Sequence, residues 1–136
     1  MKKTIYVGMA LTVSPKDFRT TFYNELNEKL QQLPEVDVLY FLDPSTGTPE
    51  KALEHNRTML KQADLMIGIC DFPSTGLGME IVERHNLGKP LLLFAHKDAT
   101  ITRMVVGFSQ QQNIPCIKYK TVDDIVESVK KELINL

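Results

Sequence analysis

The chain has 136 residues, of which 43% are hydrophobic and 24% are charged, and it carries seven glycines and seven prolines. This length and composition predict one globular domain over residues 1–136 and exclude collagen-like and disordered chains. Sixteen basic and seventeen acidic residues give a net charge of −1, which does not favour binding to a nucleic acid polymer or to an anionic membrane.

The cysteines and the start of the chain favour a cytoplasmic protein. Cys70 and Cys116 lie in apolar runs without a CxxC pair or a second ligand at metal spacing, so we expect two buried, reduced thiols and no metal site. The basic and apolar beginning of the chain stops at Ser14 and Pro15 without a cleavage region. No apolar run approaches the ~18 residues that a membrane span needs.

Short apolar runs alternate with segments whose apolar residues recur every three or four positions, which indicates parallel strands joined by helices. We expect the first strand at residues 4–10. Ser14 then caps a helix that has Pro15 at its first position and Asp17 as the partner in a capping box. The apolar face of this helix consists of Phe18, Phe22, Leu26 and Leu30.

The second strand is expected at residues 37–42, followed by a turn-rich loop at 43–48. Thr48 caps a second helix that has Pro49 at its first position and runs to about Gln62.

Three more strands are expected, and each of them is followed by a helix. The strands lie at residues 65–70, 91–95 and 114–119. A shorter helix is expected at 99–106, and the final helix begins at Thr121, with Asp124 completing a capping box. The inward face of the final helix consists of Ile125, Val129 and Leu133.

Five such units predict a three-layer α/β/α domain of the flavodoxin-like or Rossmann-like class. Because right-handed crossovers leave few arrangements, the five-stranded parallel sheet is expected to have the strand order 2-1-3-4-5. In that order the ligand crevice lies beyond the carboxyl ends of strands one and three. The candidate site therefore consists of the loops at residues 9–14 and 71–80.

The loop at residues 71–80 has the composition of an anion-binding turn. It reads DFPSTGLGME, and its two glycines let backbone amides approach a ligand. A phosphate at the helix start would be stabilised by ~0.3 to 2 kcal/mol from the helix dipole alone. The structural alternative is that Ser74 or Thr75 caps the helix and the glycines only form the turn. The motif matches neither Walker A nor the dinucleotide fingerprint.

Glu80 is expected in the first turn of the helix after this loop. The positive end of the helix dipole would there favour the carboxylate and lower its pKa, which suits a nucleophile or a charge stabiliser. The alternative is an ordinary glutamate that faces solvent. The two interpretations differ in whether Glu80 points into the crevice with Ser74 and Gly76.

Three segments together resemble the nucleoside 2-deoxyribosyltransferase family, and most closely its nucleoside 5'-monophosphate N-glycosidase branch. They read ADLMIGIC at 63–70, PSTGLGME at 73–80 and GKPLLLF at 88–94, with weaker support from Ile5-Tyr6-Val7. The resemblance implies cleavage or transfer at the N-glycosidic bond of a nucleoside or nucleoside 5'-monophosphate. It also implies that no cofactor is needed and that the chain forms a homodimer or larger homo-oligomer.

The resemblance also implies roles for individual residues. Glu80 is the nucleophile that forms a covalent glycosyl-enzyme, and Tyr6 lies beside it and the sugar, in agreement with retaining glycosidase chemistry. The 5'-phosphate is held by the loop that contains Ser74, Thr75, Gly76 and Gly78. Thr102 supplies a hydroxyl from a neighbouring subunit.

Two positions depart from the family pattern. Asn56 stands where the family usually carries an aspartate, and an amide cannot protonate the leaving base, a contribution of about 10² to 10⁴ in rate. In the first loop the family has Gly-Pro or Gly-Ser, whereas this chain has Met9-Ala10 with Gly8 one place early. We expect Gly8 and Met9 to line a sugar pocket that this bulkier loop narrows.

These departures leave a second hypothesis open, a nucleotide-binding module of the same fold with impaired catalysis. A receiver or flavin-binding domain is disfavoured, because the first strand ends without acidic residues and without a phosphate loop.

Overall fold

Five parallel strands form one sheet in the order β2-β1-β3-β4-β5, which confirms the predicted topology. The computed structural model describes residues 2–39 and 47–136. The strands are β1 (Lys3–Met9), β2 (Val36–Leu39), β3 (Leu65–Ile69), β4 (Leu91–His96) and β5 (Cys116–Tyr119). The predicted strand residues 40–42 and loop residues 43–46 lie outside the described part of the chain.

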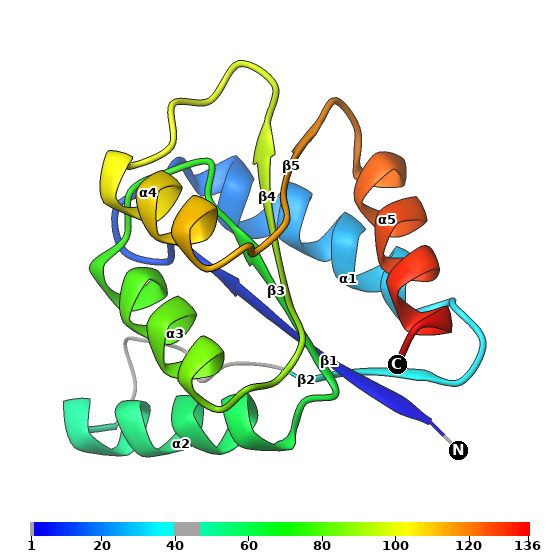
Figure 1. Cartoon of the computed structure of the whole chain (residues 1–136), viewed down its shortest axis with the longest axis horizontal. Helices are drawn as coiled ribbons and strands as arrows, with labels where there is room; N and C mark the ends of the chain where they lie inside the picture. The colour runs from blue at the N-terminus through cyan, green and yellow to red at the C-terminus, as the bar shows by residue number, and fades with distance from the viewer. Residues whose placement is uncertain (1, 40–46) are drawn as a thin grey trace.

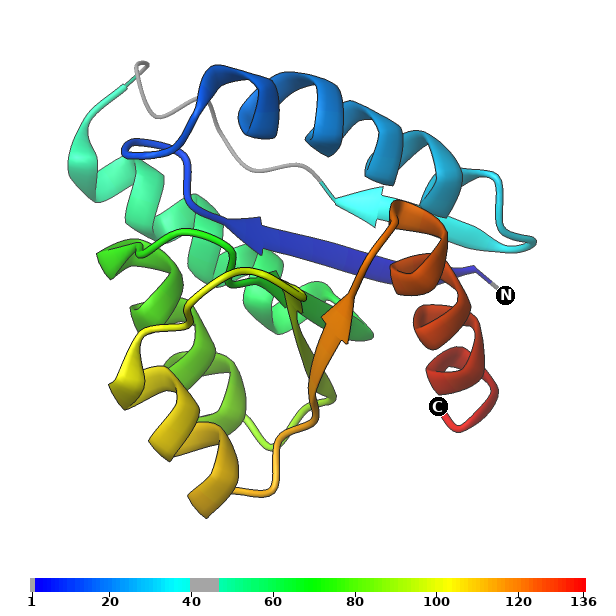
Figure 2. The ribbon, with the colours of Figure 1, turned by 90° about the horizontal axis from the view of Figure 1, so that it is seen from above.

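Helices cover both faces of the sheet and make the predicted three layers (Figures 1 and 2). One face carries η1 (Phe18–Phe22), α1 (Tyr23–Gln31) and α5 (Val122–Ile134). The other face carries α2 (Pro49–Gln62), α3 (Thr75–Asn86) and α4 (Arg103–Gln111). None of these helices is long and apolar enough to cross a membrane.

The central strands are buried on both faces. All five residues of β3 are buried, as its continuous apolar run predicts, and each large apolar side chain contributes roughly 1.5 to 3 kcal/mol through burial. The register of β1 against β3 pairs Gly8 with Gly68 and Met9 with Ile69. The two strands therefore end together, and the loops that follow them meet at the carboxyl edge of the sheet.

The first helix begins differently from the prediction. The Ser14 hydroxyl donates to the Ala10 carbonyl (3.0 Å) instead of capping a helix, and the amides of Phe18 and Arg19 both donate to the Pro15 carbonyl. The side chain of Asp17 makes no capping hydrogen bond, and a π-helical turn precedes α1. The predicted apolar face is confirmed, because Phe18, Leu26 and Leu30 are buried and Phe22 packs against them.

Two further predictions need correction. The fourth helix begins at Arg103 and not near Ala99, because Ala99 closes a turn onto His96 and its carbonyl accepts from Lys118, so its backbone groups are used outside the helix. Cys116 is exposed and not buried, since β5 forms the edge of the sheet. The buried position of Cys70 and the capping contact of Asp124 with the Thr121 amide (3.1 Å) are confirmed.

Candidate active site

A crevice of about 630 Å³ lies where the loops after β1 and β3 meet. It brings together the two loops that the sequence selects, and its described lining offers hydroxyls and backbone groups with no charged side chain. The lining residues are Ala10, Thr12, Val13, Pro73, Ser74, Thr75, Gly76 and Thr102.

The first turn of α3 forms one wall of this crevice. The Ser74 hydroxyl accepts a hydrogen bond from the Leu77 amide (3.1 Å), and the Ser74 carbonyl accepts one from the Gly78 amide (3.1 Å). Ser74 is therefore the helix cap, as the structural alternative proposes. The amides of Thr75 and Gly76 remain as donors that the helix itself cannot use, because the first amides of a helix lack intrahelical acceptors.

Gly76 keeps the approach to these amides open. A Cβ atom built on Gly76 would have the Ser74 hydroxyl oxygen, at 3.9 Å, as its nearest neighbour. The protein would therefore tolerate a methyl group at Gly76, but the group would project into the crevice. This wall has the donors and the free space that an anion needs.

Tyr6 and Glu80 form a hydrogen-bonded pair between β1 and α3. The Tyr6 hydroxyl donates to Oε2 of Glu80 at 2.5 Å, and Tyr6 is 1% exposed. Gly8 allows α3 to lie this close to β1, because a Cβ at Gly8 would stand 3.0 Å from side-chain atoms of Leu77 and Met66 and 3.5 Å from Oε1 of Glu80. A side chain at Gly8 would therefore press on Leu77 and Met66, whereas its Cβ would only touch the Glu80 carboxylate.

The electrostatics of Glu80 differ from the prediction. Glu80 lies in the second turn of α3, since the helix begins at Thr75 and its first turn contains no acidic residue. The helix dipole acts mainly within the first turn, so burial dominates and raises the pKa of Glu80 to about 7. The hydrogen bond from Tyr6 lowers this pKa, and the nearby Glu83 raises it further.

Glu80 is not among the residues that line the crevice, but it lies on the same side of α3 as Gly76, which does line it. The two residues are four positions apart, so they share a helix face and are separated by about 6 Å along its axis. An anion at the Gly76 amide would therefore stand one turn above the carboxylate. A carboxylate one turn from free amide donors can act as a nucleophile on a substrate that carries both an anionic group and an electrophilic carbon.

The other predicted site residues are spread more widely. Thr102 lines the crevice of its own chain, whereas Gly78 lines an adjoining apolar pocket between α3 and α4, which shares Thr102 with the crevice. Met9 is 3% exposed and packs in the core, so its side chain does not line the crevice. Asn56 is half-buried in α2, the helix that packs beside α3.

Sequence reasoning selected the first loop without selecting Thr12, which adds a hydroxyl opposite Ser74 and Thr75 in the crevice lining. Its position in the loop after strand one is the signal that could have found it. The described residues contain no group of three or more histidine, cysteine, aspartate or glutamate side chains that could hold a metal ion.

Comparison with known proteins gives a relative in sequence. No protein-family model matches the chain. A protein of Thermofilum pendens named "Putative 2'-deoxynucleoside 5'-phosphate N-hydrolase 1" is 28% identical over 95 residues, which are 68% of this chain. The match spans 66% of the length of that relative.

Solved structures share the fold. The CMP N-glycosidase BcmB of Clostridium botulinum superposes with a TM-score of 0.71 at 18% identity, covering 96% of this chain and 99% of that one. A 2-deoxyribosyltransferase of Leishmania mexicana gives a TM-score of 0.56 at 24% identity, covering 70% and 65% of the two chains. The sequence match and the shared fold confirm the resemblance of this chain to the nucleoside 2-deoxyribosyltransferase family.

Proposed function

We propose that the protein cleaves or transfers at the N-glycosidic bond of a nucleoside 5'-monophosphate or nucleoside through a covalent glycosyl-Glu80 intermediate. The observation that carries the proposal is the Tyr6–Glu80 pair, held one helical turn below the open amides at the start of α3. The names of the relative in sequence and of the structural neighbours support the same class of reaction.

The 5'-phosphate would bind the Thr75 and Gly76 amides together with the hydroxyls of Ser74 and Thr102. This contact places the sugar over Glu80. The Glu80 carboxylate then attacks the anomeric carbon, and the bond to the base breaks with its electron pair leaving on the base. Water or a second base attacks the same carbon, releases the sugar and restores the carboxylate. The raised pKa of Tyr6, which is caused by burial and by Glu80, keeps its proton on the hydroxyl to orient the nucleophile.

The catalytic claim is tested by incubating the protein with deoxyribonucleoside and ribonucleoside 5'-monophosphates and measuring free base by chromatography. We expect base release that Glu80→Ala abolishes while monophosphate binding persists. Base release that is unchanged in Glu80→Ala would reject the proposed nucleophile.

Asn56 favours a second candidate, a nucleotide-binding module that turns substrate over slowly or not at all. Asn56 cannot protonate the leaving base, so the wild-type protein would bind a monophosphate without releasing product. Asn56→Asp supplies the missing acid. Gained hydrolysis identifies an impaired enzyme, whereas tight binding with no hydrolysis in either form identifies a binding module.

We also propose that two copies associate through the outer faces of α3 and α4. An apolar pocket of about 410 Å³ lies between these helices, and three apolar side chains on them are exposed: Met79, Val82 and Met104, the last by 84%. Sedimentation velocity measures the assembly. We expect a dimer that Met104→Glu dissociates, and a monomeric wild-type protein would refute the proposal.

A further inference from the structure

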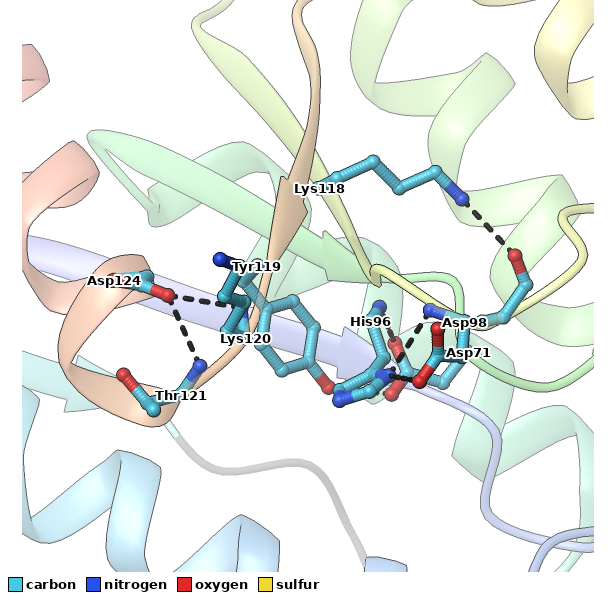
Figure 3. Close-up of polar contacts among 9 residues, drawn as sticks. Asp71, His96, Asp98, Lys118, Tyr119, Lys120, Thr121 and Asp124 are labelled. Carbon is cyan, nitrogen blue, oxygen red and sulfur yellow. Dashed lines mark hydrogen bonds and ion pairs between the residues drawn. The ribbon is translucent and has the colours of Figure 1, made fainter.

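The loop that carries the phosphate-binding amides is tied to two neighbouring strands at its first residue. Asp71 lies two residues after the end of β3, and its Oδ1 accepts a hydrogen bond from the His96 amide at the end of β4 (3.0 Å). Its Oδ2 accepts one from the Tyr119 hydroxyl at the end of β5. Figure 3 draws Asp71, His96 and Tyr119 close together at the ends of these strands. One side chain therefore joins the carboxyl ends of three strands.

The second residue of the loop is held by aromatic packing. The ring of Phe72 meets the ring of Phe18 edge-on at 4.8 Å between centroids, and Phe18 stacks on Phe22 at 5.1 Å. Phe22 in turn stacks on Tyr119 at 5.8 Å. This row of rings ends at Tyr119, whose hydroxyl also donates to Asp71. The hydrogen bond of Asp71 and the ring packing of Phe72 are therefore parts of one connected set of contacts.

The chemistry of the Asp71–Tyr119 contact makes it a strong tether. Tyr119 is 4% exposed, and burial together with the hydrogen bond to Asp71 raises the pKa of its phenol, so Tyr119 remains a donor. A hydrogen bond to an ionised carboxylate is about twice as strong as one between neutral groups. Pro73 then fixes one backbone angle between this tether and Ser74.

We propose that Asp71 and Tyr119 are positioning residues that fix the loop in the geometry that receives the substrate's 5'-phosphate. The inference rests on the proposed function and extends it to residues that line no part of the crevice. Amides that are already in place bind an anion without the entropic cost of ordering the loop. The tether therefore acts on binding of the phosphorylated substrate and not on the Tyr6–Glu80 pair, which lies between β1 and α3.

Two variants weaken the tether with little change in volume. Tyr119→Phe removes the hydroxyl and retains the ring, and Asp71→Asn removes the charge. The matched control is Asp124→Asn, a carboxylate on the same edge of the sheet that accepts from the Lys120 and Thr121 amides at the start of α5 (Figure 3). Asp124 supports the start of α5, and within the described part of the chain its carboxylate bonds to the Lys120 and Thr121 amides and not to the loop at residues 71–80.

The kinetic test separates positioning from a general loss of structure. For a nucleoside 5'-monophosphate we expect both tether variants to raise KM about tenfold and to leave kcat within about twofold of wild type, because small misplacements of binding groups cost affinity of this order. The KM of the double variant should be similar to that of each single variant, because both substitutions act on the same hydrogen bond. Asp124→Asn should retain the wild-type KM. An unchanged KM in both tether variants, or an equal rise in the control, would overturn the inference.

Amide hydrogen exchange on the ligand-free protein tests the tether independently of activity. We expect faster exchange at residues 74–78 in Tyr119→Phe and Asp71→Asn, and wild-type exchange there in Asp124→Asn. If the wild-type protein releases no base from any nucleotide, the proposed function fails, and this exchange measurement alone decides the inference. Wild-type exchange at residues 74–78 in both tether variants would overturn it.

Discussion

Glu80 carries a raised pKa because its carboxyl group is largely removed from water, and this desolvation links activity to stability. The attacking group is the carboxylate, so base release should increase with pH up to about 7 and level off above it. A profile that is flat between pH 5 and 8 would contradict an ionising Glu80 nucleophile. The ordinary pKa of 4.5 describes the same group in the unfolded chain.

Replacing Glu80 by glutamine should stabilise the protein at high pH. Below pH 4.5 Glu80 is protonated in the folded and the unfolded protein. Between pH 4.5 and 7 it ionises in the unfolded chain but stays protonated in the folded one, so the free energy of unfolding falls as the pH rises. Above pH 7 this loss of stability is complete. Glu80→Gln should therefore be more stable than wild type by about 1 to 3 kcal/mol at pH 8 and similar to it near pH 4. Urea unfolding at both pH values measures the difference.

Tyr6→Phe removes the hydrogen bond that lowers the pKa of Glu80. The pH at which base release reaches half its maximum should therefore move upward, by roughly one unit. Tyr119→Phe is the matched control, because it deletes a phenol hydroxyl away from Glu80. We expect the control to leave the midpoint of the pH profile in place, and an equal midpoint in Tyr6→Phe and wild type would show that the pair is not coupled.

Gly76→Ala should weaken ligand binding in the crevice without changing the stability of the fold. The new methyl group meets no protein atom closer than 3.9 Å, so the helix should be as stable as before, but the group occupies the approach to the Thr75 and Gly76 amides. We expect the Kd for a nucleoside monophosphate to rise at least tenfold by calorimetry. Gly107→Ala, on an exposed part of α4 with no neighbour within 4 Å, is the control and should bind normally. Normal binding by Gly76→Ala would show that the start of α3 does not bind the phosphate.

At the scale of elements, Arg84 joins α2, α3 and the start of β4. Its side chain is fully buried, donates to the carbonyls of Leu60 and Ala63 (2.8 Å to Ala63), and donates twice to the Pro90 carbonyl. Burial lowers the pKa of Arg84 to about 10, which leaves it charged at neutral pH. These contacts fix the end of α2 against the helix that carries Glu80.

Arg84→Met should therefore destabilise the protein strongly. The substitution leaves the buried carbonyls of Leu60 and Ala63 without the Arg84 donor, at a cost of about 2 kcal/mol or more. The Pro90 carbonyl keeps its hydrogen bond from the Met66 amide. The control is Arg57→Gln, which removes an exposed ion pair with Glu83 between the same two helices and should change the unfolding midpoint little. Comparable urea midpoints for Arg84→Met and wild type would show that these contacts do not support the fold.

Sequence patterns predicted the elements wherever one local signal was sufficient. The apolar runs identified the strands, and Thr48, Ser74 and Thr121 mark helix starts that the structure confirms. The start of α4 was missed because it depends on contacts of Ala99 with residues distant in sequence, one of them Lys118. The π-helical turn before α1 had no local signal that was recognised.

At the scale of the molecule, topology alone brought the correct loops together. The strand order places the ends of β1 and β3 side by side, and the crevice lies there. The desolvation of the Glu80 carboxyl group could not be predicted, because it depends on the close approach of α3 to Gly8, which is a property of packing. The hydrogen bond between Asp71 and Tyr119 could not be predicted either, because the two residues are 48 positions apart in the chain.

The most direct test of the central claim is mass spectrometry of the protein quenched with acid during turnover of a 2'-deoxynucleoside 5'-monophosphate. The account predicts a sugar phosphate in ester linkage on the peptide that contains Glu80, and no such adduct in Glu80→Gln. Turnover of the nucleotide with an adduct on a different residue, or with the same rate in Glu80→Gln, would contradict it.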